Sequence, residues 1–261
     1  MATTEENKRI WDTVYNWKGG GEEWSMPWGG TDMEWYFTIL PRIHSFVPAQ
    51  TILEIAPGYG RWSQFLAGLC HNLILVDLSE KCIEACRDRF KPYSHIKYFV
   101  NDGGSLEMIP DGSVDFMFSF DSLVHVEDKV IEKYLSQVSR KLKKSGGGFI
   151  HHSNVGQNKV YYFFVNRMPN IVKLALSALN RWRGYSMSAE KFRTYAKNAG
   201  LHCVSQEIIN WANDKRLIDC LSVFKKDEVS ECQTPVILRN KGFKNSVKQI
   251  HQLSRLYKNR L

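Results

Sequence analysis

Short apolar runs alternate with amphipathic stretches along residues 50–227. Five runs have the length and composition of buried strands: residues 51–56, 72–77, 96–100, 113–120 and 149–153. Between them, apolar positions recur at helical spacing over residues 61–70, 80–90 and 128–144. Because parallel strands need crossover connections, this alternation predicts an α/β fold built on a doubly wound, mostly parallel sheet.

The pattern continues beyond the fifth run. Ser188 is a candidate N-cap for a helix over residues 189–199, and Gly200 is placed to end that helix. Residues 201–211 and 216–226 then predict two late strands. The predicted sheet therefore has seven strands.

Two aromatic segments lie outside this regular pattern. Residues 1–49 carry five of the eight tryptophans on a glycine-broken sequence: Trp11, Trp17, Trp24, Trp28 and Trp35. They predict an aromatic N-terminal arm, which either packs on the body or closes as a lid over a ligand. Residues 155–187 are an aromatic and basic insertion, which either shapes an acceptor pocket or packs as a helical hairpin.

Residues 228–261 are predicted to form a polar link and a basic amphipathic tail. Seven of the 35 basic residues lie from Arg239 onward, where no acidic residue occurs, so residues 1–238 carry 28 basic against 27 acidic residues. This near-neutral body argues against a nucleic-acid groove. Residues 239–261 are expected to lie on an anionic membrane surface, to dock on a partner protein or to cap the protein's own core.

Composition favours a reduced, cytoplasmic protein that is soluble or peripherally attached to a membrane. The six cysteines form no CxxC pair, and no apolar core follows the polar first residues. No apolar stretch reaches the roughly 20 residues of a membrane helix. No metal site is predicted from the cysteines.

Acidic residues close three successive predicted strands. Glu54 precedes a glycine turn with Gly58 and Gly60, Asp77 ends the second strand, and Asp102 follows the third. A carboxylate at the end of the second strand accepts both hydroxyls of a ribose, and one after the third strand can accept from an adenine amino group. Glu54 would repel a pyrophosphate but suits a cationic amino group, which disfavours a nicotinamide oxidoreductase.

Over about residues 50–227 the chain resembles the class I S-adenosylmethionine-dependent methyltransferases. The resemblance rests on LEIAPGYGRWS, LILVDLSEKCIEAC, FVNDGGSLEMIPDGSVDFMFSFDSLVHVE, LKKSGGGFIHHSN and MSAEKFRTYAKNAGLHC. It implies a seven-stranded Rossmann-like sheet, S-adenosyl-L-methionine as the cofactor and a site at the strand ends. GYGRWS and GGGFIHHSN look most like bacterial enzymes that modify polysaccharides and sugars.

The resemblance also implies a cofactor role for individual residues. It places Glu54 at the methionine end, Asp77 at the ribose and Asp102 at the adenine amino group. Beside them it places the remaining cofactor-binding residues: Ala56, Pro57, Gly58, Gly60, Leu78, Gly103 and Phe120. Ala56 stands where the family most often has its first glycine, so the geometry of the turn is open.

Methyl transfer to a hydroxyl requires a base, and a histidine is the usual one. His125 follows the fourth strand, whereas His151 and His152 close the fifth, where neighbouring residues point to opposite faces. His125 and His152 are the candidate bases, and Asp121 is a candidate catalytic residue in the loop of His125. In an alternative, Asp121, His125, Asp128 and a fifth-strand histidine hold a metal, although their spacing matches no fixed motif.

These features together predict an enzyme that O-methylates a sugar or glycan hydroxyl with a histidine base. The alternatives are a methyltransferase of another small molecule, one of a glycan-terminal phosphate, an RNA methyltransferase that the near-neutral body disfavours, and a cofactor-binding assembly subunit without catalysis. The expected partners are a small-molecule or glycan acceptor and a second copy of the chain in a homo-oligomer. Cofactor binding is common to these alternatives, and turnover separates them.

Overall fold

An eight-stranded sheet forms the centre of the molecule. The structure is a computed structural model that describes residues 3–158, 167, 183–211, 216–226 and 234–258. The strand order is β3-β2-β1-β4-β5-β7-β6-β8. The strands are β1 (Ala49–Ile55), β2 (Cys70–Asp77), β3 (Ile96–Val100), β4 (Val114–Ser119), β5 (Leu142–Ser153), β6 (His202–Asn210), β7 (Leu217–Lys225) and β8 (Val236–Asn240).

The predicted fold class is confirmed, with one strand more than expected. β1 to β5 run parallel, and β7 runs antiparallel to both β5 and β6. The additional strand, β8, pairs in parallel with β6 within residues that the sequence pattern assigned to the tail. It is a five-residue edge strand whose apolar side chains are exposed, so it lacks the buried pattern of the other strands.

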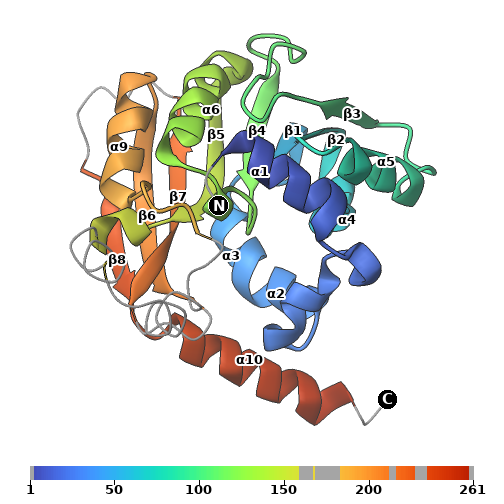
Figure 1. Ribbon diagram of the computed structural model, residues 1–261, viewed down its shortest axis with the longest axis vertical. Coiled ribbons are helices and arrows are strands. Elements are labelled where there is room, and N and C mark those ends of the chain that lie inside the picture. The colour runs from blue at the N-terminus through green and yellow to red at the C-terminus, as the bar shows by residue number, and fades with distance from the viewer. Residues whose placement is uncertain (1–2, 159–166, 168–182, 212–215, 227–233, 259–261) are drawn as a thin grey trace.

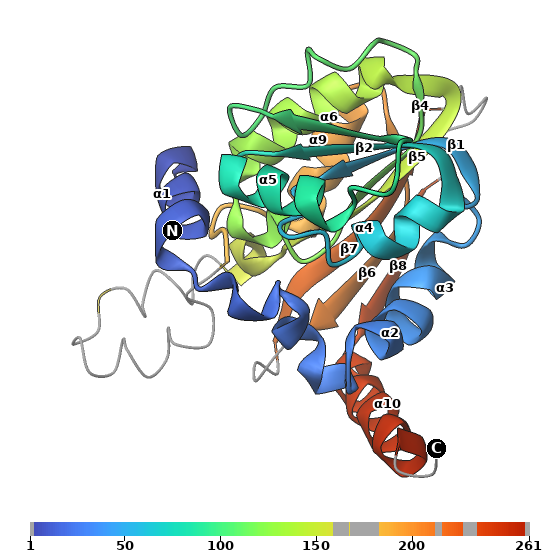
Figure 2. The ribbon, with the colours of Figure 1, turned by 90° about the vertical axis from the view of Figure 1, so that its right-hand side faces the viewer.

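Helices cover both faces of this sheet, as the layered α/β architecture requires. α6 and α9 lie on one face, whereas α3, α4, α5 and the first half of α10 lie on the other (Figure 2). The α-helices are α1 (Thr4–Arg9), α2 (Thr31–Glu34), α3 (Leu40–Ile43), α4 (Ser63–Leu66), α5 (Glu80–Arg89), α6 (Asp128–Lys141), α9 (Ala189–Asn198) and α10 (Phe243–Lys258). The shorter 3₁₀ and π segments are η1 (Ile10–Val14), η2 (Trp17–Gly19), η3 (Glu22–Trp28), η4 (Trp35–Ile39), η5 (Ala67–Leu69), η6 (Leu123–His125) and η7 (Val155–Asn158).

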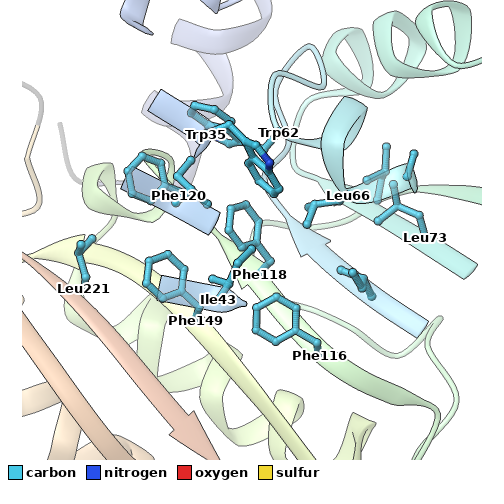
Figure 3. Close-up of a cluster of buried hydrophobic side chains, with 14 of the residues drawn as sticks. Trp35, Ile43, Trp62, Leu66, Leu73, Phe116, Phe118, Phe120, Phe149 and Leu221 are labelled. Carbon is cyan, nitrogen blue, oxygen red and sulfur yellow. The ribbon is translucent and has the colours of Figure 1, made fainter. Parts of the chain in front are cut away.

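The larger core joins the sheet to the N-terminal arm. Phe116, Phe118 and Phe149 from β4 and β5 pack with Trp35 of the arm and with Trp62 before α4 (Figure 3). The Trp35 ring stacks on Trp62 with 6.3 Å between ring centroids. Aromatic side chains each bury a large apolar area, so these contacts attach the short helices of the arm to the sheet.

The tail contributes to the same core through α10. Phe243 and Val247 are buried, whereas Leu253, Leu256 and Tyr257 are exposed. Figure 1 shows α10 crossing one end of the sheet below α2. The first half of the helix therefore caps the protein's own core, and contact of its exposed second half with a membrane or partner stays a prediction.

The predictions about the insertion and about membrane helices can be compared only with the residues that the structure describes. Most of the insertion at residues 155–187 lies outside the described residues, although Arg183 and its neighbours at the end of it are placed. Within the described residues, no helix is long and apolar enough to cross a membrane.

Candidate functional site

A cavity, cavity 1, opens at the carboxyl ends of β1, β2 and β4. Its wall on the sheet side comes from the turn after β1, the end of β2, the loop after β3 and the loop after β4: Ala56, Pro57, Gly58, Tyr59, Asp77, Leu78, Gly103, Phe120 and Asp121. Ligands of open α/β sheets bind at these strand ends, next to the point where the strand order reverses. Between β1 and β4 the order reverses in this sheet.

The turn after β1 is held in left-handed backbone conformations. Ala56 has φ 58°, Gly58 has φ 58° and Gly60 has φ 81°. A Cβ atom on Gly60 would lie 2.5 Å from the Phe90 ring, so a side chain there has no room. Ala56 adopts a conformation that glycine accepts without strain, which is the structural meaning of its departure from the family pattern.

Asp77 lies in this cavity with its carboxylate held by backbone donors. Gly58 N–H donates to Oδ2 at 3.1 Å, and Ser79 N–H donates to Oδ1 at 2.9 Å. Burial raises the pKa of this carboxyl to about 6, while these donors oppose the rise. The carboxylate keeps acceptor positions for a ligand, as the predicted ribose contact requires.

Glu54 lies under the turn and does not line cavity 1. Its side chain is buried and accepts a hydrogen bond from Ser63 Oγ at 2.6 Å. Burial raises the pKa of the Glu54 carboxyl to about 8. The expected contact of Glu54 with the methionine end of a cofactor stays a prediction.

The loop after β3 contributes its glycine, whereas its aspartate points elsewhere. Gly103 lines cavity 1, and a Cβ atom on it would lie 2.5 Å from Thr4 of α1. The Asp102 side chain is exposed; it accepts from the N–H groups of Gly104 and Ser105 and pairs with Lys133 at 2.9 Å. The adenine contact expected of Asp102 therefore stays a prediction that this geometry does not favour.

The N-terminal arm covers cavity 1. Trp17 stacks on Tyr59 with ring centroids 4.4 Å apart and an interplanar angle of 4°. Ser79 Oγ at the start of α5 donates a hydrogen bond to Asp12 of the arm. Asn7 also lines the cavity; the residue is 97% buried, and its Oδ1 accepts no hydrogen bond from the part of the chain that the structure describes. A buried acceptor without a donor is costly, so a ligand donor at this place would satisfy it.

A second cavity, cavity 2, adjoins the first. The two share Trp11, Trp24, Asp121 and His125. One wall of cavity 2 belongs to the arm, with Tyr15, Glu23, Pro27 and Trp28. The rest of its lining comes from the end of the insertion, the end of β6 and α10, with Arg183, Asn210, Trp211, Phe243, Lys244, Val247 and Lys248.

Asp121 lies at the junction of the cavities in a strained backbone conformation. Its φ is 59°, which is costly for a residue other than glycine and is typical of functional sites. Arg61 donates to its Oδ2 at 2.9 Å and lies 3.7 Å from Glu34. Burial opposes the charge of Asp121, but Arg61 and Arg183 hold the pKa of its carboxyl below the usual range. Asp121 is therefore a weak base that is fixed in place.

The three histidines occupy different environments. His125 lines both cavities, and its ring packs on Trp11 at 5.3 Å between centroids. His151 is buried between Phe120 and Trp211, and its Nδ1 accepts from the N–H of Asp121 at 3.2 Å.

His152 lies on the opposite face of the sheet from His151. Its ring stacks on Phe192 of α9, and Ser222 Oγ lies 2.8 Å from its Nε2. Burial lowers the pKa of His152 to about 4. It lines neither cavity, and its side chain is enclosed between β5 and α9.

The alternative metal set is not assembled. Asp128 pairs with Lys191 and accepts from Ser186 Oγ and Tyr195 Oη, on the side of α6 and α9. Among the residues that the structure describes, no group of three or more histidine, cysteine, aspartate or glutamate side chains is placed to hold a metal.

Several site residues carry no motif that reveals them in the sequence. Asn7 and Arg61 line cavity 1 and Lys244 lines cavity 2, although the three lie far apart in the chain. Two sequence signals did identify other lining residues. The glycine-broken aromatic arm identified Trp11, Trp17 and Trp24 as candidates to cover a ligand, and the insertion that contains Arg183 was predicted as a possible wall of the acceptor pocket.

Comparison with known proteins identifies the domain to which this site belongs. Residues 52–146 match the family described as "Methyltransferase domain". That segment contains the turn after β1, Asp77 and the loop of His125. This part of the chain is therefore similar to a methyltransferase domain.

Curated relatives of this methyltransferase domain match it over a limited segment. Phosphoethanolamine N-methyltransferase 1 of Triticum aestivum is 30% identical over 118 residues, which are 43% of this chain and 24% of the relative. Phosphoethanolamine N-methyltransferase 2 of Caenorhabditis elegans is 30% identical over 111 residues, which are 41% and 25%. The chain therefore spans about a quarter of the length of these relatives.

Solved structures show the same fold. The N-methyltransferase NodS from Bradyrhizobium japonicum is 18% identical, with a TM-score of 0.56, and the match covers 76% of this chain and 97% of NodS. An S-adenosylmethionine-dependent methyltransferase from Mesorhizobium loti is 16% identical, with a TM-score of 0.54 over 75% of this chain and all of the other.

The cofactor of this family and fold is S-adenosyl-L-methionine, and cavity 1 fits it. The glycine turn lets the backbone approach a ligand closely. The Asp77 carboxylate and Asn7 Oδ1 are hydrogen-bond acceptors for hydroxyl and amino donors of the ligand. Pro57, Leu78 and Phe120 supply apolar walls. Asp77 would hold the ribose, and the arm would cover the cofactor from outside.

Proposed function

We propose that this chain transfers the methyl group of S-adenosylmethionine to a hydroxyl of a sugar or other small acceptor bound in cavity 2. The observation that carries the proposal is the junction of the two cavities, which share Asp121 and His125. The bound cofactor supplies an electrophilic methyl group on a sulfonium. An acceptor in cavity 2 meets that group only at this junction.

His125 is the proposed base. A ring nitrogen of His125 would take the proton of the acceptor hydroxyl while the hydroxyl oxygen bonds to the methyl carbon. The bond from that carbon to sulfur would break at the same time, its electron pair staying on sulfur, and S-adenosylhomocysteine would be the leaving group. Asp121 is less suited, because the guanidinium of Arg61 stabilises its charged form. His151 and His152 line neither cavity, so the proposal excludes both from direct contact with the acceptor. Asp121 orients the site through its pair with Arg61.

Single-turnover transfer by His125→Gln tests this assignment. Removing a general base is expected to slow methyl transfer about 10²- to 10⁴-fold while the affinity for S-adenosylhomocysteine stays within twofold. The matched control is His71→Gln, since His71 is exposed on β2 and lines neither cavity. Transfer by His125→Gln at the wild-type rate would remove His125 from the mechanism.

The arm is proposed to act as a lid over the cofactor. Its support is the stack of Trp17 on Tyr59 and the bond from Ser79 to Asp12, which close cavity 1 from outside. Amide hydrogen exchange across residues 10–24 is expected to slow when S-adenosylhomocysteine binds. Exchange there that is identical with and without this ligand would show a fixed arm.

A second candidate is N-methylation of a small amine. The identity to phosphoethanolamine N-methyltransferases favours it, although that match covers about a quarter of those proteins. A panel of sugars and amino alcohols, followed by release of S-adenosylhomocysteine, separates the two. Turnover confined to amines would replace the hydroxyl acceptor in the proposal and leave the methyltransferase assignment intact.

A further inference from the structure

Three cations line cavity 2 and are called its basic wall: Arg183, Lys244 and Lys248. Arg183 lies near the end of the insertion and pairs with Asp219 of β7, whereas the two lysines lie on α10. The acids that line it are Glu23, on the arm wall, and Asp121, whose charge is paired with Arg61. We propose that Arg183 and the first two turns of α10 form a subsite for the phosphate group of a phosphorylated small acceptor; this inference rests on the proposed function.

Arg183 is a rigid element of this wall. Its Nε and Nη2 each donate to Asp219 at 2.9 Å, and Nη1 takes no part in that pair. The guanidinium lies 5.9 Å from the Trp211 ring centroid. A guanidinium whose plane is fixed presents its remaining donors in one direction, which suits the oxygens of a phosphate.

The two lysines are positioned by the buried side of α10. Lys244 and Lys248 are one helical turn apart, and each directly follows a buried residue that anchors the helix in the core, Phe243 and Val247 respectively. The N–H of Lys244 donates to Asn210 Oδ1 at 3.2 Å. The first turn of α10 holds no acidic residue, so the positive end of the helix adds to the lysine charges.

Cavity 2 also leads from the basic wall to the junction with cavity 1. It extends from this basic wall to Asp121 and His125, where it meets cavity 1. An acceptor anchored by its phosphate at α10 therefore directs its nucleophile toward the junction. Trp28 and Trp211 form apolar sides between these ends, with ring centroids 5.4 Å apart.

The test compares probes that differ by one phosphate, on the full chain saturated with S-adenosylhomocysteine. The pairs are glucose 6-phosphate with glucose and phosphoethanolamine with ethanolamine, and inorganic phosphate is a fifth probe. Binding is measured by calorimetry and by the fluorescence of the tryptophans that line the cavity. We expect the phosphorylated member of at least one pair to bind ten times more tightly or better. Equal affinity within both pairs would overturn the inference.

Charge variants on α10 locate the binding. Lys244→Ala and Lys248→Ala are each expected to raise the Kd of the bound phosphorylated probe about three- to tenfold, and the double variant by more than either. The control is Arg255→Ala, an exposed cation on the same helix that lines neither cavity, with an expected change below twofold. An equal loss in Arg255→Ala would show general attraction of anions and would overturn the subsite.

Two further experiments distinguish a lipid phosphate from that of a small acceptor, and failure of the phosphate subsite from failure of the proposed function. Binding to vesicles containing phosphatidic acid, with no soluble probe bound, would overturn the small-acceptor assignment in favour of a lipid surface. If a phosphorylated acceptor is methylated and Lys244→Ala leaves its KM unchanged, the phosphate subsite fails and the proposed function stands. If no acceptor is methylated, the proposed function itself fails.

Discussion

Replacing Asp77 measures how much one buried carboxylate contributes to cofactor binding. Its oxygens each accept one backbone N–H, from Gly58 at 3.1 Å and from Ser79 at 2.9 Å. Each oxygen therefore keeps a position for one ribose hydroxyl. Hydrogen bonds to a charged group contribute about 1.5–3 kcal/mol each, and water compensates part of their loss. We expect Asp77→Ala to weaken S-adenosylhomocysteine binding by about 10- to 100-fold and Asp77→Asn by about tenfold.

The pH dependence of the same variant adds a second readout. Burial raises the pKa of Asp77 to about 6, and ribose hydroxyls donate to its ionised form. Wild-type affinity should fall as the pH drops below about 6, whereas Asp77→Asn should lose this dependence. The effect on folding without ligand has the opposite sign. The folded protein binds the proton of Asp77 more tightly than the unfolded chain does. The contribution of Asp77 to the free energy of unfolding therefore falls as the pH rises from about 4 to about 6.

Calorimetric titration from about pH 5 to pH 8 gives both results. Asp88→Asn is the control, since Asp88 is an exposed acid on α5 that lines neither cavity. Circular dichroism checks that the turn held by Asp77 still folds. Affinity of a folded Asp77→Asn within twofold of wild type at neutral pH would refute the ribose assignment.

Three further changes test the packing and charges around the site by urea unfolding. Burial raises the pKa of Glu34 to about 8, so the free energy of unfolding should decline as the pH rises from about 4.5 to about 8. Glu34→Gln should reduce this decline, and an unchanged slope of the free energy of unfolding against pH would contradict the reasoning. Ala56→Gly relieves the left-handed backbone and should raise the free energy of unfolding by about 1 kcal/mol, whereas helical Ala67→Gly should lower it. Phe243→Ala should lower the free energy of unfolding by about 3–5 kcal/mol, whereas replacing the exposed Tyr257 by alanine should change it little. Similar losses in Phe243→Ala and Tyr257→Ala would mean that α10 does not cap the core.

The alternation of strands and helices was predictable because each central strand is a continuous apolar run. Residues 51–56 and 72–77 are bounded by glycine and polar residues and correspond closely to β1 and β2. β8 was missed because an edge strand with exposed side chains has neither an apolar run nor an alternating buried face. Its pairing with β6 is a tertiary interaction that local pattern cannot report.

The site residues that directly follow a strand were the ones that the sequence could predict. Asp77 and the glycine turn lie together in cavity 1, because parallel strands place their carboxyl ends at one edge. The position of Asp102 depends on the loop conformation, in which Lys133 attracts its carboxylate away from the cavity. Alternation along β5 predicted that His151 and His152 would face opposite sides, but the phase of that alternation is decided by packing on Phe192.

Transfer of an isotopically labelled methyl group would show whether the chain methylates a small acceptor. The full chain is incubated with S-adenosylmethionine carrying a deuterated methyl group and a mixture of sugars, sugar phosphates and amino alcohol phosphates, and the mixture is analysed by mass spectrometry. We expect a labelled methyl group on at least one small acceptor with wild type and with Asp88→Asn, and a strong loss of label with Asp77→Ala. Tight binding of S-adenosylhomocysteine without label on any acceptor would contradict it.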